Sequence, residues 1–167
     1  KEGDGNLQPA VGVHNHQVFR ANRDYPQYAD DYGYTYNHAP MLAWWQGKFY
    51  LEYLSAPVDE EQAKCHTLLC TSDNGRDWTK PEVVFPYLRI DGKDTVAHQR
   101  MGFYIAPNGR FLMLAFHGVE GHTNDGQGPG RVVREVYADH SLGPIYVFKL
   151  NSGYSASDFG YPYYTES

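Results

Sequence analysis

Two histidines, His98 and His117, stand nineteen residues apart on what the sequence predicts to be one β-hairpin. The outgoing strand covers residues 101–105, the turn is Pro107-Asn108-Gly109, and the returning strand covers residues 110–116. Because the strand ends of a hairpin come together, we expect both imidazoles at a common rim of one sheet. Neutral imidazole, with a pKa of about 6.5, suits proton abstraction at neutral pH. The alternative is a pair of structural histidines that make hydrogen bonds at strand ends.

Three arginines and one tyrosine are the candidate substrate-binding residues: Arg100, Arg131, Arg134 and Tyr104. Arg131 and Arg134 are three residues apart in a predicted strand, so they point to opposite faces and at most one enters a site. An arginine there would hold a carboxylate through two parallel hydrogen bonds. Tyr104 offers an aromatic face for stacking on a sugar, although core packing is the competing interpretation.

The elements that must position these residues are short β-strands. The chain has 167 residues with 16% aromatics, 17 glycines and 10 prolines, a composition typical of a turn-rich all-β protein. Residues 47–51 and 109–113 repeat a Gly-basic-Phe pattern, which favours repeated hairpin sheets such as propeller blades. We expect one helical turn over residues 58–64, after Pro57.

Residues 71–78 fit the Asp-box pattern, Ser/Thr-x-Asp-x-Gly-x-x-Trp. This pattern resembles the turn between the outer strands of sialidase-type propeller blades. We expect Asp73 to accept backbone N–H bonds inside the turn, Gly75 to adopt a positive φ, and Trp78 to pack between sheets.

The length predicts that residues 1–167 form one propeller portion of about three to four blades with four-stranded antiparallel sheets. Closed propellers need more blades, so we expect the N-terminal part of a larger ring that the remaining blades complete.

Charge and hydropathy narrow the class of protein. A net charge of −6 argues against a nucleic-acid partner, and no apolar run approaches the ~18 residues of a membrane helix. Cys65 and Cys70 are poorly placed to bridge each other, and we expect free thiols or partners elsewhere. The polar start fits the remainder of a cleaved signal peptide, so we expect a secreted, periplasmic or cell-surface protein.

Together with the Asp box, four segments resemble one seven-bladed propeller group: residues 36–40, 98–102, 130–135 and 143–146. The group contains the α-L-rhamnosidases of glycoside hydrolase family 145 and related lyases of rhamnose–glucuronate and ulvan linkages. The similarity runs from about Tyr34 to Asn151.

The resemblance implies two mechanisms. In the lyases a histidine pair, an arginine and often a tyrosine carry out β-elimination at a uronic acid, and His98, His117 and Tyr163 match those roles. In the rhamnosidases one histidine near the chain start is essential, which implies His38, His16 or His14. Some relatives carry glutamine there, which keeps Gln17 open. The expected cofactor is none, with an axial Ca²⁺ left open because these propellers can hold a metal ion.

We therefore expect an enzyme that cleaves rhamnose–glucuronic acid linkages of an acidic oligosaccharide or polysaccharide, by elimination or hydrolysis. The main alternative is a propeller that binds glycans without catalysis. A sialidase is a weaker third hypothesis, because Arg89-Ile90 is followed by Asp91 where that family's motif has proline, and three clustered arginines are not recognisable.

Overall fold

The computed structural model describes residues 11–60, 62–121 and 127–165, with the backbone alone for residues 99–101. Within these residues the structure is all-β apart from two short helical segments, η1 (Pro26–Tyr28) and α1 (Ala156–Phe159). The strands are β1 (Tyr36–Trp45), β2 (Lys48–Ala56), β3 (His66–Ser72), β4 (Glu82–Phe85), β5 (Arg89–Ile90), β6 (Lys93–Ile105), β7 (Phe111–Val119), β8 (Gly130–Val136) and β9 (Tyr146–Leu150).

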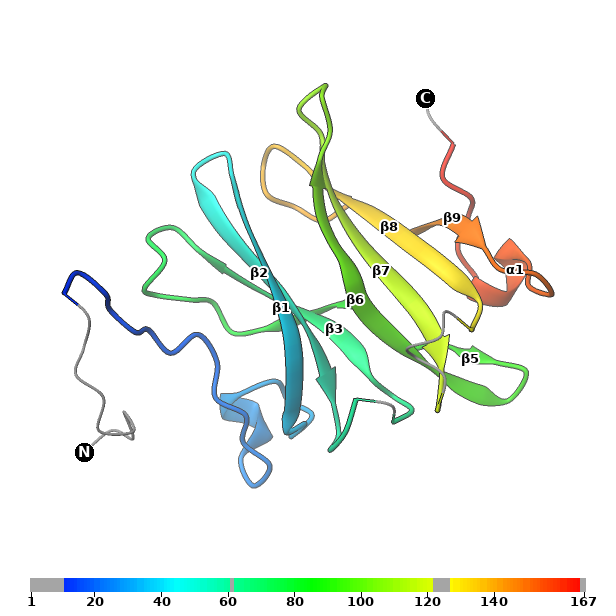
Figure 1. Cartoon of the computed structure of the whole chain (residues 1–167), viewed down its shortest axis with the longest axis horizontal. Helices are drawn as coiled ribbons and strands as arrows, with labels where there is room; N and C mark the ends of the chain where they lie inside the picture. The colour runs from blue at the N-terminus through cyan, green and yellow to red at the C-terminus, as the bar shows by residue number, and fades with distance from the viewer. Residues whose placement is uncertain (1–10, 61, 122–126, 166–167) are drawn as a thin grey trace.

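The strands form two antiparallel meanders that lie side by side (Figure 1). The first sheet has the order β1-β2-β3-β4 and the second the order β5-β6-β7-β8-β9. Tight turns set the register: Gln46 and Gly47, with φ of 46° and 82°, connect Trp45 to its partner Lys48. A two-residue turn with two positive φ angles matches the right-handed twist of the strands that it joins. The predicted all-β fold with a four-stranded antiparallel blade is therefore confirmed.

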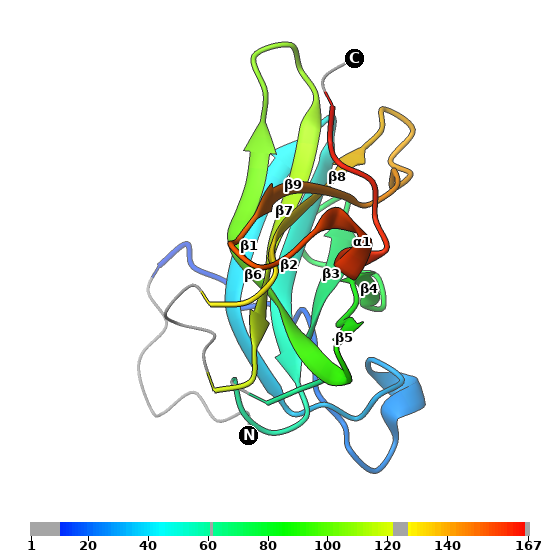
Figure 2. The same cartoon turned by 90° about the vertical axis from the view of Figure 1, so that its right-hand side faces the viewer.

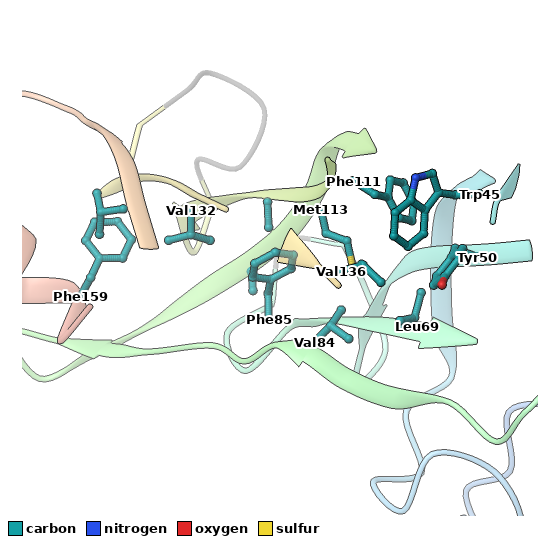
Figure 3. Close-up of a cluster of buried hydrophobic side chains, with 13 residues drawn as sticks. Trp45, Tyr50, Leu69, Val84, Phe85, Phe111, Met113, Val132, Val136 and Phe159 are labelled. Atoms are coloured by element: carbon teal, nitrogen blue, oxygen red, sulfur yellow. The ribbon is translucent and has the colours of Figure 1, made fainter. Parts of the chain in front are cut away.

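A hydrophobic core fills the space between the two sheets (Figure 3). Phe111 of β7 lies between Trp45 and Tyr50 of the first sheet, with ring centroids 5.1 and 4.9 Å away. Aromatic rings at this spacing add to the free energy gained from burying their area. Strands β1 and β6 lie in contact where the two sheets meet (Figure 2).

Two predictions about organisation differ from the structure. The described residues form two sheets, where the length predicted three to four blades, because β6 alone takes thirteen residues and residues 11–35 precede the first strand. The helical turn predicted over residues 58–64 is wrong. Its described residues form bends and turns in the connection between β2 and β3.

The Asp-box turn is present, but Asp73 does not hold it. Gly75 has φ of 71°, as predicted. The side chain that accepts backbone N–H bonds is Asn74. Its Oδ1 lies 2.8 Å from the Arg76 amide nitrogen and 2.9 Å from that of Asp77. Ser72 Oγ accepts the Gly75 N–H at 2.9 Å. Asp73 points outward to Lys48 Nζ at 2.6 Å, so its predicted role in the turn is wrong.

Cys65 and Cys70 are both buried free thiols, as expected. No helix in the described part of the chain is long and apolar enough to cross a membrane.

Candidate functional site

His98 and His117 point to opposite faces of their hairpin. The register pairs Ala97 with His117 and His98 with Phe116. Paired residues share a face and successive residues alternate, so His117 lies on the face of Ala97 and His98 on the other. The expectation that both imidazoles meet at one rim is therefore wrong. The two strand ends do come together, but a shift of one residue in the register separates the rings.

His117 belongs to the packed interior. It has no exposed surface, and its ring meets the Phe159 ring edge-on, with centroids 5.5 Å apart. Thr95 Oγ1 accepts the Leu88 N–H at 2.7 Å and lies 3.1 Å from His117 Nδ1. Because a hydroxyl oxygen can accept two hydrogen bonds, the imidazole tautomer decides which of these two atoms donates. Burial lowers the pKa of His117 to about 3, so the ring is neutral over the physiological range.

His98, on the other face, contacts a carboxylate that the sequence analysis did not single out. Its Nε2 lies 3.0 Å from Glu60 Oε1, and the same oxygen lies 3.5 Å from Nδ1 of His38. The structure thus brings together two predicted catalytic residues, His38 and His98, through Glu60. We call these three residues the imidazole–carboxylate cluster.

Three separate elements build the cluster. His38 lies near the start of β1, His98 within β6, and Glu60 in the connection from β2 to β3. The start of β1 and the end of β2, which leads into the connection that holds Glu60, lie at the bottom of Figure 1. Both strands carry a β-bulge directly after their histidine, between His38 and Met41 and between His98 and Gly102. Bulges of this kind redirect side chains, and they occur often beside functional sites.

Exposure within the cluster is graded. The side chain of His98 is 1% exposed, that of Glu60 22% and that of His38 53%. A buried imidazole therefore anchors one side of the carboxylate while an accessible imidazole stands on the other. Tyr36 is close by, with its ring 5.7 Å from that of His38, and its pKa is raised by partial burial and by the negative charge of Glu60. Such an arrangement can pass a proton between solvent and a buried hydrogen bond.

A small hollow of about 240 Å³ adjoins the cluster. His38 and Asn37 line it together with Gln17, which the segment before β1 contributes, and the rest of the wall is largely apolar. Two side-chain amides and an imidazole therefore line the hollow.

The arginine predictions fare differently from one another. Arg131 and Arg134 do point to opposite faces, because their partners in β7 are Phe116 and Met113. Arg134 donates to the carbonyl oxygens of Val84 and Gly143, at 3.0 and 2.7 Å, and so ties the two sheets together. The guanidinium of Arg131 lies over the Phe116 ring, 5.5 Å from its centroid. The Arg100 side chain lies outside the described residues.

The two tyrosine candidates lie away from the cluster. Tyr104 is six residues beyond His98 in β6, roughly 20 Å along a strand, near the opposite end of the hairpin. Tyr163 bridges to Val147 of β9, which is three strands out from β6. Both side chains are about half exposed. The structure does not bring either of them to His38 or His98.

Glu60 was missed because it falls in the segment that the sequence predicts to be a helical turn. Its only sequence signal is an acidic run between two strands, which solvated loops share. Among the described residues no group of three His, Cys, Asp or Glu side chains is arranged to hold a metal ion, so no ligand is assigned to an axial Ca²⁺.

Comparisons with known proteins place this geometry in context. The profile of the BT_1020-like N-terminal β-propeller family matches residues 1–167. A solved structure named sialidase superposes with a TM-score of 0.87 at 43% identity, covering 96% of this chain and 16% of that one. A xylan β-1,4-xylosidase from Bacillus halodurans C-125 matches with a TM-score of 0.43 at 21% identity, over 70% of this chain and 21% of that one. No curated protein matches the chain. The chain thus spans about one sixth of the length of the matched sialidase.

Proposed function

The chain belongs to the BT_1020-like N-terminal β-propeller family, and from this premise we propose that it supplies two blades of a propeller enzyme that cleaves glycosidic bonds in an acidic glycan. The observation that carries the proposal is the imidazole–carboxylate cluster, in which Glu60 lies between a buried and an accessible histidine. The 43% identity to a protein named sialidase supports a carbohydrate as the substrate.

In this proposal His38 is the catalytic residue that reaches the substrate. Its imidazole takes a proton from the attacking water, and the Glu60 carboxylate stabilises the imidazolium that forms. His98 is a positioning residue, because its Nε2 contact at 3.0 Å fixes the carboxylate from the buried side. In this proposal another blade supplies the acid that protonates the departing sugar oxygen, on the face of the sugar opposite the attacking water.

Hydrolysis fits this geometry better than elimination. Elimination at a uronic acid by the pair His98 and His117 requires both rings on one substrate, and they face opposite sides of the sheet. We therefore propose hydrolysis, with a rhamnose–glucuronic acid linkage as the first substrate to test. Arg100 is retained as the candidate partner of the sugar carboxylate, since Arg134 is held by two carbonyl oxygens.

A sialic acid linkage is the second candidate, favoured by the name and the identity of the matched structure. Both candidates share a sugar carboxylate beside the scissile bond. We further propose that the protein acts outside the cell, where such glycans are found.

Further blades complete the ring in this proposal. Phe49 in β2 and Phe111 in β7 each follow a turn glycine by two residues. Phe111 packs on the first sheet, whereas Phe49 faces away from the second sheet, since its neighbour Tyr50 lies in the shared core. Leu42 and Trp44, 62% and 51% exposed, lie in the strand beside Phe49. The outer face of the first sheet thus repeats the pattern that the second sheet uses to contact its neighbour.

The test is to incubate the full natural protein with gum arabic and, separately, with a sialylated glycoprotein. Released rhamnose or sialic acid without absorbance at the unsaturated-uronate band supports hydrolysis, and release with that absorbance supports elimination. The Glu60→Gln variant must lose the release, while His117→Gln serves as the matched control. If no sugar is released from either glycan, the enzyme proposal is wrong and a non-catalytic glycan-binding propeller replaces it.

A further inference from the structure

A second hollow among the described residues, larger than the one that His38 lines, lies outside the imidazole–carboxylate cluster. Its volume is about 790 Å³. The walls come from the β5–β6 turn, the end of β7, the segment before β8, the loop after β9, and Ala63 of the β2–β3 connection. The second sheet and its loops therefore form most of the hollow, and the β2–β3 connection adds Ala63.

The lining combines carboxylates with apolar surface. The residues that line the hollow include three carboxylates and one ammonium group: Asp91, Asp94, Glu120 and Lys93. The remaining walls include these residues: Ile90, Val119, Pro129 and Tyr154. An uncharged sugar suits this mixture, because its C–H faces pack on aliphatic and aromatic side chains while its hydroxyls donate to carboxylates.

The charge of the lining selects against acidic ligands. Arg89 Nη1 lies 3.7 Å from Asp94 Oδ1 and offsets part of that charge, and Glu120 Oε1 lies 3.5 Å from the Ala63 amide nitrogen. Asp91 and Glu120 both belong to exposed positions, where a sugar carboxylate placed beside either costs about 1 kcal/mol at 4 Å in water and more as solvent is excluded.

One connection links the hollow to the cluster. Glu60 contacts the two histidines, and Ala63, three residues later, lines the hollow. Three residues span at most roughly 10 Å of chain. An oligosaccharide can therefore occupy both places at once.

We propose that this hollow is a second subsite, one that binds uncharged sugar residues of the glycan whose acidic residue is cleaved at the cluster. The link to cleavage rests on the proposed function, whereas the binding of uncharged sugar does not. Tyr154 and Glu120 are the binding residues in this proposal, through ring stacking and through acceptance of hydroxyl protons.

The test uses a matched pair of probes that differ only in charge: α-1,4-trigalacturonate and the same trimer after reduction of its carboxyl groups to galactose. Binding to the full natural protein is measured by calorimetry, in the cleavage-deficient Glu60→Gln background. We expect the reduced trimer to bind at least 10-fold more tightly than the acidic one, and Tyr154→Ala to weaken it at least 10-fold. Glu120→Lys narrows or reverses the preference, whereas Glu82→Lys, the same charge change at an exposed residue of β4, leaves it unchanged.

Three outcomes overturn the inference: no binding of the reduced trimer, binding that Tyr154→Ala and Glu120→Gln both leave intact, or a preference that Glu82→Lys moves as much as Glu120→Lys does. The proposed function fails separately. If wild-type protein releases no sugar from any acidic glycan while the reduced trimer binds as described, the hollow stands as a sugar-binding site without cleavage.

Discussion

His98 and His117 lie on paired strands of one hairpin, yet they occupy opposite kinds of environment. His98 contacts a carboxylate that an accessible histidine shares, whereas His117 is enclosed by Thr95 and Phe159. The difference comes from the register alone, because Ala97 and not His98 stands opposite His117. Two histidines on neighbouring strands therefore differ in role: His98 contacts the carboxylate of the cluster, and His117 packs in the interior.

The largest effect expected from this comparison concerns activity. His98→Gln in the full natural protein should lower the rate of sugar release by about 100-fold or more, because Glu60 loses its buried partner. His117→Gln should change the rate at neutral pH by less than about 3-fold. The rates are measured on the glycan identified as substrate. Similar losses of the rate of sugar release in the two variants would show that His98 and His117 do not differ in role.

The second effect is the stability of the protein in acid. The pKa of His117 is about 3 when folded and 6.5 when unfolded, so the unfolded state binds more protons between these values. Stability therefore falls as pH drops from 6.5 towards 3, at up to about 1.4 kcal/mol per pH unit for this one group. His66, whose pKa burial lowers to about 4, adds to the same decline.

His117→Gln should flatten this acid decline without abolishing it, since His66 still contributes. Thermal unfolding of the full protein between pH 7 and pH 4, followed by tryptophan fluorescence, measures the slope. A variant that keeps the wild-type slope would show that His117 is hydrated in solution.

The third effect concerns Glu52, a carboxylate that is more deeply buried than Glu60. Glu52 is fully buried in β2, and neither of its carboxyl oxygens has a hydrogen-bond partner among the described residues. Burial raises its pKa well above the ordinary 4.5. The folded state then holds a proton that the unfolded state releases, so stability is full below about pH 4.5 and is lost as pH rises towards the folded pKa.

Glu52→Gln should remove this alkaline decline, because an amide does not ionise. Unfolding temperatures between pH 5 and pH 9 test it, with Glu82→Gln as a control at an exposed position of β4. A decline of equal slope in Glu52→Gln would assign the pH dependence to other groups.

The smallest effect lies in the Asp-box turn. Asn74→Ala should cost about 1 kcal/mol, because two backbone amide N–H groups of the turn lose their acceptor. Asp73→Ala removes only a surface ion pair and should have the smaller effect on stability. Denaturant unfolding of the two variants gives the difference. The reverse order would restore Asp73 as the residue that holds the turn.

The sequence was informative wherever local chemistry decides structure. The Gln46-Gly47 turn and the turn that includes Gly109 produce the two hairpins that their residue types predict, and Gly75 adopts its positive φ. The face of the sheet on which each side chain lies was harder to predict. A β-bulge in β6 and the length of the turn decide whether His98 and His117 share a face. Glu60 could not be found from local pattern, since its two partners are supplied by strands distant in sequence.

The most direct test of the imidazole–carboxylate cluster is histidine-selective ¹⁵N NMR on the full natural protein, with and without Glu60→Gln. The account predicts that this substitution moves the ring signals of His98 and His38, whereas His117 keeps the shifts of a neutral ring. Unchanged signals for His98 and His38, or a shift of His117 comparable to theirs, would contradict it.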